Sequence, residues 1–210
     1  SYKFRLYPSR KQQLILYKML DIARFAYNKQ LELKIVAYKK DKTNLRQFDL
    51  NNNLIKLKEE FPFLKQLHSQ TLQNISQRIN FAFNNFYGSI KNKKGSGFPR
   101  FKGKNRYDSI IYPQSGFKLN NKLYLSKVGT IDIRLHRKID GKIKTLTIKK
   151  TSTNKWFASF SVEQEMNDKK SNLNNIIGID LGLNHFYADS NSNLIDNPRC
   201  LRHSEEKLAK

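Results

Sequence analysis

The spacing of apolar residues changes near Asp108, and this change constrains the fold more than any other feature of the sequence. Between residues 9 and 90, apolar residues recur at gaps of three and four, which is typical of amphipathic helices. From Asp108 to Val162 they alternate with polar residues in short runs, which is typical of strands. The sequence therefore predicts an α+β fold.

Three helices are predicted in the first part. The first follows Pro8-Ser9 and ends in the polar run 40–44, and the second stops before Pro62. The third starts from Ser69 as its N-cap. Phe83 and Phe86 lie on the apolar stripe of the third helix, so we interpret them as core residues rather than as platforms for stacked bases.

Five short strands are expected between residues 117 and 162. The turns between them contain Asn120-Asn121, Asp140-Gly141 and Thr153-Asn154-Lys155, which predicts a small β-barrel or a strongly bent sheet. Residues 2–7 alternate apolar and basic side chains and would add a strand to this sheet. The helical bundle, residues 9–96, would then be an insertion between the first strand, in 1–8, and the rest of the barrel, in 97–166.

A third region is expected after a polar linker at 167–175. Residues 176–184, Ile-Ile-Gly-Ile-Asp-Leu-Gly-Leu-Asn, are typical of a buried strand that ends on a single acid, Asp180, between two glycines. A buried strand tolerates a carboxylate only at an open end that faces water, metal or phosphate. With two further strand candidates behind it, 176–210 looks like the start of an RNase H-like α/β domain. A turn-forming aspartate remains the alternative.

The charge of the chain is uneven. Its 210 residues include 40 Lys and Arg against 17 Asp and Glu, a formal charge of +23. Only four of the basic and five of the acidic residues follow residue 173, so residues 1–173 carry an excess of +24. Because Lys and Arg bind phosphates with release of counterions, a nucleic acid is the expected partner of this part.

The densest basic stretch is 91–106, in which glycine and phenylalanine are interleaved with lysine and arginine. Glycine lets backbone N–H groups approach phosphates, and phenylalanine can stack on a base. We interpret 91–96 as a solvated linker and the following Gly-Phe-Pro-Arg-Phe-Lys as structured. The expected contacts to nucleic-acid backbone are Arg100, Lys102, Lys104 and Arg106, with Lys149 from the basic face of the strand 143–150.

The single cysteine, Cys200, excludes a disulfide framework and a multi-cysteine zinc site within this chain. No apolar run approaches the ~20 residues of a membrane span, and the first residues do not form a signal peptide. We expect a reducing, cytoplasmic compartment, no membrane and no bound zinc. The last region has three candidate strands and no crossover helix, so we expect a carboxy-terminal portion or a second chain to complete it.

Short motifs spread over essentially the whole chain carry a resemblance to a known family. The chain resembles the TnpB/OrfB proteins of insertion sequences, compact RNA-guided DNA endonucleases related to the type V CRISPR effectors. The motifs are Phe4-Arg5-Leu6-Tyr7-Pro8, Ala23-Arg24-Phe25-Ala26-Tyr27-Asn28, Leu72-Gln73-Asn74, Gly97-Phe98-Pro99-Arg100-Phe101-Lys102, Gly178-Ile179-Asp180-Leu181-Gly182-Leu183 and Asn197-Pro198-Arg199.

The resemblance implies a wedge-like β-barrel split by a helical recognition domain, followed by a RuvC nuclease domain. It also implies a guide RNA and a double-stranded target DNA beside a short transposon-adjacent motif. Gln73 and Asn74 match the segment that reads this motif, and Tyr112 and Gln114 fall where the barrel contributes to the reading. Amides suit this role because Asn and Gln can contact adenine through two hydrogen bonds.

By the same resemblance, Asp180 is the first catalytic aspartate and a ligand of Mg²⁺. RuvC-type cleavage uses two metal ions, which one aspartate cannot hold. The second acid, the four-cysteine zinc ribbon and the third acid are expected beyond Lys210. The chain as given should therefore bind nucleic acid without cutting it.

Three alternatives stay open. A nuclease-inactive guided repressor of the same family and an unguided basic transposase share the binding features. An actin- or Hsp70-like ATPase also begins with Gly-Ile-Asp-Leu-Gly, but its hairpin continues with Thr or Ser where this chain has Leu183-Asn184. An ATPase also does not explain the basic body that precedes this hairpin.

Overall fold

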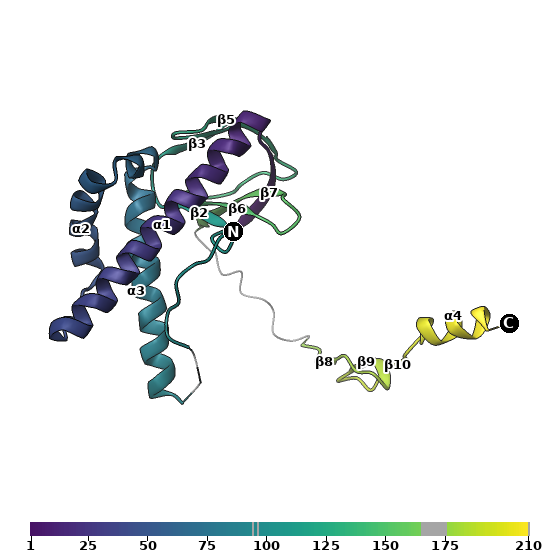
Figure 1. Ribbon diagram of the computed structural model, residues 1–210. Helices are drawn as coiled ribbons and strands as arrows, with labels where there is room; N and C mark the ends of the chain where they lie inside the picture. The colour runs from purple at the N-terminus through teal and green to yellow at the C-terminus, as the bar shows by residue number, and fades with distance from the viewer. Residues whose placement is uncertain (94, 96, 165–175, 210) are drawn as a thin grey trace. The chain divides into compact units, whose positions relative to one another are not determined.

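The computed structural model describes residues 1–93, 95, 97–164 and 176–209. The chain forms two compact units, Ser1–Glu165 and Met166–Lys210 (Figure 1). The linker expected at 167–175 lies outside the described residues. None of the described helices is both long and apolar enough to cross a membrane.

The first unit contains a seven-stranded antiparallel sheet with the order β2-β6-β7-β1-β5-β4-β3. Its strands are β1 (Tyr2–Tyr7), β2 (Ser109–Tyr112), β3 (Phe117–Leu119), β4 (Leu123–Leu125), β5 (Gly129–Arg134), β6 (Lys142–Lys150) and β7 (Trp156–Glu163). As expected, the amino-terminal strand belongs to this sheet, and its place is central: Arg5 lies opposite Phe157 on one side and Arg134 on the other. The helices are therefore inserted between β1 and β2.

The sheet is nearly closed and barrel-like. Tyr112, at the end of edge strand β2, donates a hydrogen bond from its hydroxyl to the carbonyl of Ser126, 3.2 Å away, just past β4. The N–H of Ser126 donates to the carbonyl of Gly116, before β3, at 2.7 Å. Gly116 has φ +88°, and a Cβ there would lie 2.9 Å from the Tyr112 ring, so both the turn and the close approach require glycine.

The inner faces of the strands form the barrel core, and aromatic and branched side chains fill it. The fully buried members include Phe4, Leu6, Leu123, Leu125, Ile131, Leu146, Ile148, Trp156, Ala158 and Phe160. The turn between β3 and β4 spans 120–122, because Leu119 pairs with Leu123, so it is one residue longer than predicted. The strand β2 was not predicted as a separate element.

The inserted helices are α1 (Arg10–Asp41), α2 (Gln47–Glu60) and α3 (Ser69–Lys91), with a 3₁₀ turn η1 (Pro62–Gln66) before α3. Ser9 caps α1 as predicted, through a reciprocal pair of hydrogen bonds with Gln12. The N-cap of α3 is His68, not Ser69. Phe83 is buried as expected, whereas Phe86 is half-buried. The apolar stripe of α3 is thus open near its carboxyl end, where Ile90 is exposed.

The second unit contains β8 (Ile179–Asp180), β9 (His185–Asp189), β10 (Leu194–Asp196) and α4 (Cys200–Leu208). Its antiparallel sheet has the order β10-β9-β8. A strand does end at Asp180 as predicted, but its predicted burial is wrong, because Ile176, Ile177 and Ile179 are exposed, as are Leu181 and Leu183 beyond it. Within 176–184 only Ile179 and Asp180 pair as a strand, and no second layer of described residues covers them.

Candidate nucleic-acid interface

One pocket of about 190 Å³ is lined almost entirely by side-chain amides. It lies between α2, α3 and the loop that joins β2 to β3. The structure brings three of the residues proposed to read DNA, Gln73, Asn74 and Gln114, into this one site. Its lining residues are Gln47, Asn51, Gln70, Gln73, Asn74, Gln77, Pro113 and Gln114.

The helical period of α3 produces this amide face. Positions 70, 73, 74 and 77 lie on one side of the helix, while Leu72, Ile75 and Ile79 are buried on the other. Gln70 fixes the neighbouring loop, because its Oε1 accepts hydrogen bonds from the N–H and the hydroxyl of Ser115, at 3.1 and 3.0 Å. The amide face and the β2–β3 loop are therefore held together before any ligand arrives.

The amides differ in how far they are already engaged. Asn74 donates from Nδ2 to Gln77 Oε1 at 3.0 Å. The exposed Gln73 and Gln114 make no side-chain hydrogen bond to any residue that the structure describes. Asn51 Oδ1 is buried and accepts no hydrogen bond from the described residues, which costs roughly 1–3 kcal/mol. The pocket thus offers free donors and acceptors at Gln73 and Gln114, and one further acceptor, Asn51 Oδ1, is buried beneath its surface.

Tyr112 is not part of this surface. Its side chain is fully buried, and its hydroxyl is used by the bond to Ser126 that closes the barrel. Burial raises the pKa of this hydroxyl above its ordinary value. A side chain that reads bases needs an exposed polar edge. Tyr112 has none, so its role is to close the barrel, and it lies outside the proposed motif-reading surface.

The basic loop, residues 97–106 between α3 and β2, is attached to α1 through Asn28. Asn28 accepts a hydrogen bond from the N–H of Lys102 at 2.8 Å and donates from Nδ2 to the Lys102 carbonyl at 3.0 Å. The Lys102 ammonium lies 5.7 Å from the centroid of the Tyr27 ring. This double contact fixes the backbone at Lys102 and holds its charge over the surface of α1.

A second polar pocket, of about 290 Å³, opens beside this contact. It brings together Lys102 and Arg106 from the loop and Arg78 from α3. Arg78 donates to the carbonyl and the hydroxyl of Ser109, both at 3.2 Å, and lies 5.2 Å from the centroid of the Tyr107 ring. Three cations thus converge on one hollow, which suits an anion such as a phosphate. The remaining lining residues are Tyr27, Ala82, Tyr107 and Asp108.

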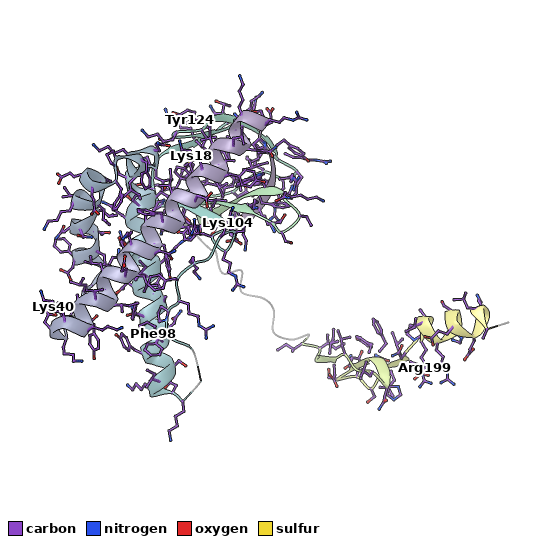
Figure 2. All side chains as sticks on the ribbon, in the orientation of Figure 1. Lys18, Lys40, Phe98, Lys104, Tyr124 and Arg199 are labelled. Atoms are coloured by element: carbon purple, nitrogen blue, oxygen red, sulfur yellow. The ribbon has the colours of Figure 1, made fainter. Side chains whose placement is uncertain are left out.

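The other predicted backbone contacts lie outside this pocket. Arg100 and Lys104 are exposed, and Figure 2 shows Lys104 at the surface of the first unit. Lys149 is exposed on β6 and forms an ion pair with Asp108 at 3.4 Å. Part of the Lys149 charge is therefore already offset, and a phosphate would compete with Asp108 for it.

Sequence reasoning missed Arg78 and most of the amide set. Gln70 and Gln77 continue the spacing of Gln73 and Asn74 along α3, so a helical projection of the amides would have indicated them. Gln47 and Asn51 come from another helix, and only the packing of α2 against α3 brings them to the pocket. Arg78 carried no motif of its own.

Asp180 ends β8, where it pairs with Ala188 of β9. A Cβ on Gly182 would lie 3.1 Å from the His185 carbonyl, so this glycine permits a close approach of the backbone. Beyond Asp180, the turn before β10 is closed by Asp189, which accepts hydrogen bonds from Asn191 and Asn193.

Within the described ranges, no group of three or more His, Cys, Asp or Glu residues is placed to hold a metal ion. Mg²⁺ binds through several oxygen ligands, and Asp180 supplies one carboxylate. The described residues therefore do not form a magnesium site by themselves.

Comparisons with known proteins point in one direction. A family model described as a helix-turn-helix domain, HTH_OrfB_IS605, matches residues 1–43. In the structure this segment is β1 followed by α1, a single uninterrupted helix. The whole chain is 26% identical over 215 residues to "Putative RNA-guided DNA endonuclease InsQ" of Escherichia coli strain K12. It is 28% identical over 217 residues to "Putative RNA-guided DNA endonuclease" of Streptomyces pristinaespiralis. The chain spans 52% of the length of each of these relatives.

Proposed function

Because this chain is a homologue of the TnpB/OrfB proteins of the IS605 family, we propose that it is the part of an RNA-guided DNA endonuclease that binds the guide RNA and the target motif. One observation carries the proposal: the adjacent residues Gln73 and Asn74 of α3 and the sequence-distant Gln114 line a single amide pocket. The charge excess of residues 1–173 supports a polyanionic partner.

The amide pocket is proposed to read the target-adjacent motif in double-stranded DNA. Free amides suit this role, because Asn or Gln can donate to N7 and accept from N6 of adenine in the major groove. Gln73 and Gln114 have both groups available, and Asn51 offers a buried acceptor behind them. The amides carry no net charge, so they would contribute selectivity rather than general affinity.

The second polar pocket, a basic pocket lined by Arg78, Lys102 and Arg106, is proposed to hold nucleic-acid backbone. Arg78, Lys102 and Arg106 would contact phosphate there, with Arg100, Lys104 and Lys149 extending the contact over the surface. Burial raises the pKa of the Tyr107 hydroxyl, although the neighbouring Arg78 acts in the other direction. Because the net shift is upward, the hydroxyl is protonated at neutral pH and adds no negative charge to the pocket.

Asp180 is proposed to be one carboxylate ligand of Mg²⁺ in a RuvC-type site whose other ligands lie outside the described residues. When bound in such sites, the metal stabilises charge on the oxygens of the phosphodiester. In this chain, the role of Asp180 would be limited to presenting its carboxylate from the end of β8.

The nucleic acid that purifies with the chain tests this proposal most directly. Extraction and sequencing should yield one defined, structured RNA, and removal of this RNA should abolish selective binding to motif-containing DNA. DNA alone would favour an unguided transposase, and bound nucleotide would favour an ATPase. Either result contradicts the guided function. A guided repressor would give the same RNA but no cleavage in a complete protein.

A further inference from the structure

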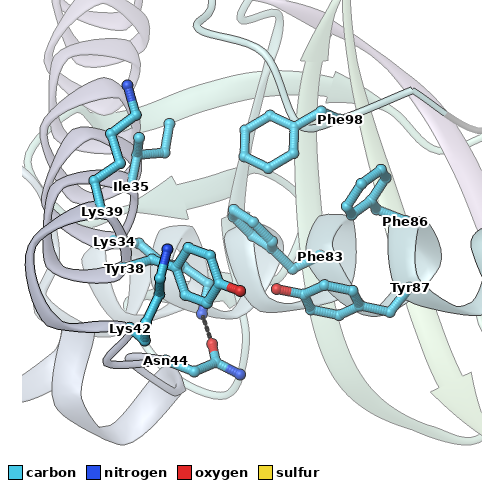
Figure 3. Close-up of a pocket in the computed structure, with 10 residues that line it drawn as sticks. All are labelled: Lys34, Ile35, Tyr38, Lys39, Lys42, Asn44, Phe83, Phe86, Tyr87 and Phe98. Carbon is cyan, nitrogen blue, oxygen red and sulfur yellow. Dashed lines mark hydrogen bonds between the residues drawn. The ribbon is translucent and has the colours of Figure 1, made fainter.

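A third pocket, of about 410 Å³, lies apart from the amide and basic pockets and is lined by aromatic rings and lysines (Figure 3). It is formed by the carboxyl ends of α1 and α3, the residue Asn44 that follows α1, and Phe98 of the basic loop. Its ten lining residues include three lysines and no acid: Lys34, Ile35, Tyr38, Lys39, Lys42, Asn44, Phe83, Phe86, Tyr87 and Phe98.

The aromatic wall is preformed. Phe98 packs edge-on against Phe83 and Phe86, with ring centroids 5.4 and 5.3 Å apart. The hydroxyls of Tyr38 and Tyr87 point toward each other across the opening in Figure 3. Despite this packing, Tyr38, Tyr87 and Phe98 remain 51%, 45% and 46% exposed. The rings are therefore held in place while part of their surface stays open to a ligand.

The polar groups of the pocket have separate roles. The buried Lys34 donates from Nζ to Asn44 Oδ1 at 2.8 Å and to the Leu45 carbonyl, so its ammonium is already engaged. Lys39 and Lys42 are exposed and form no ion pair with any described residue. The Lys42 ammonium lies 5.3 Å from the centroid of the Tyr38 ring. A ring that offers a stacking surface thus lies beside a free positive charge.

We infer that this pocket binds one unpaired nucleotide of a nucleic-acid strand, with its base against the aromatic wall and its phosphate near Lys39 and Lys42. A base has two flat apolar faces and is joined to an anion, which is the combination that exposed rings beside lysines recognise. The volume lies within the ~300–1,000 Å³ typical of small-molecule sites. An apolar peptide would pack against the rings but would leave the ammonium groups of Lys39 and Lys42 without an anionic partner.

The inference rests on the proposed function in one respect, which is that the ligand is a nucleic acid. It differs from that function because it assigns a stacking site for a single base, away from the residues proposed to read the motif and to hold the backbone. The RNA or DNA source of the nucleotide is decided by the experiment, since both strands offer the same base and phosphate.

The test measures binding of oligouridine and oligothymidine of equal length by fluorescence anisotropy. Base stacking predicts that Tyr38→Ala and Phe98→Ala each weaken binding roughly 5- to 150-fold, and that Tyr38→Phe retains it. Tyr124→Ala is the matched control: Tyr124 is 44% exposed on β4, and Figure 2 shows it at the opposite end of the first unit from Phe98. Circular dichroism would confirm that each variant is folded.

A photocrosslink gives an independent result. Irradiation of the same oligonucleotides with 5-iodouracil at one position should attach the base to Tyr38, Tyr87 or Phe98, as located by peptide mass spectrometry. If Tyr38→Ala, Phe98→Ala and Tyr124→Ala all bind like the parent while Lys102→Ala binds weakly, the stacking site is wrong and the proposed function stands. If the parent chain binds no nucleic acid, both are wrong.

Discussion

The two units of the chain treat apolar strand residues in opposite ways. Ile148 of β6 is fully buried inside the barrel, whereas Ile179 of β8 is 58% exposed. Both are isoleucines in paired strands, so pairing alone does not bury a side chain. The barrel encloses its own inner face, but the sheet of the second unit has three short strands and no covering layer among the described residues. Burial therefore follows from closure of the sheet.

The proposed roles divide along the same line. The amide pocket, the basic pocket and the aromatic pocket all lie in the first unit, whose rigid core can fix their geometry. Asp180 lies in the second unit, which is close to neutral and has little core. We expect substitutions in the first unit to change binding or folding and those in the second to change cleavage.

The largest effect is expected at Asp180. In a protein that carries this chain together with the acids needed to complete the metal site, Asp180→Ala should abolish DNA cleavage, because a metal ligand is lost. Guide-dependent binding should persist and could strengthen, since one negative charge near phosphates is removed. Cleavage and gel-shift assays on the same preparation measure the two properties. Cleavage by the Asp180→Ala protein would contradict the assigned role.

The next effect concerns salt. Binding of the purified RNA should weaken by orders of magnitude from low to moderate salt, because each neutralised phosphate contributes about 0.7–0.9 to the log–log slope. Lys102→Ala in the first unit should reduce this slope by about one. Lys207→Ala in the second unit is the control and should leave it unchanged. A slope near zero for the parent chain would show that the basic surface does not bind phosphates.

The contrast in burial predicts a matched pair of stability changes. Ile148→Ala should lower the free energy of unfolding by about 2–5 kcal/mol, because it leaves a cavity in the barrel core. Ile179→Ala makes the same chemical change at an exposed position and should alter it by about 0.5 kcal/mol or less. Denaturant titration followed by Trp156 fluorescence measures the change in the first unit, and hydrogen exchange of the β9 amides measures the change in the second. Equal losses would mean that another layer covers β8 in solution.

The smallest expected effect distinguishes the amide pocket, which is proposed to read bases, from the basic pocket, which is proposed to hold the backbone. Gln73→Ala should cost about 1–3 kcal/mol of binding to DNA with the correct motif and much less with a mismatched one, because it removes a contact to a base edge. Lys102→Ala should weaken both DNAs alike. Affinities are compared for the guide-loaded chain on the two duplexes. If Gln73→Ala affects both duplexes equally, Gln73 does not read bases.

Local sequence patterns predicted the elements better than their environment. The Ser9 cap, the break before Pro62 and the pairing of β1 into the sheet were confirmed, because each depends on nearby residues or on strand alternation. The predicted burial of the strand that ends at Asp180 was wrong, because the apolar content of a strand does not show whether a second layer covers it. Tyr112 was predicted to contribute to motif reading, and the structure buries its side chain at the closure of the barrel.

The candidate site was predicted only in part, because local sequence patterns do not show how the helices pack against one another. The family resemblance indicated Gln73, Asn74 and Gln114, and the structure brings them together. Gln47, Asn51 and Arg78 reach their pockets only through helix packing, which the sequence does not specify position by position. The aromatic pocket was not predicted, because Phe83 and Phe86 were assigned to the core and the open end of α3 could not be foreseen.

The central place of β1 in the sheet has a consequence for how the chain folds during synthesis. Arg5 leaves the ribosome well before its partners, Arg134 and Phe157, which appear only when most of the first unit has been made. The helices between β1 and β2 have local contacts and can form in the meantime. Until then β1 is an unpaired strand with both edges free, so it is exposed to mispairing while the residues up to β5 and β7 are being made.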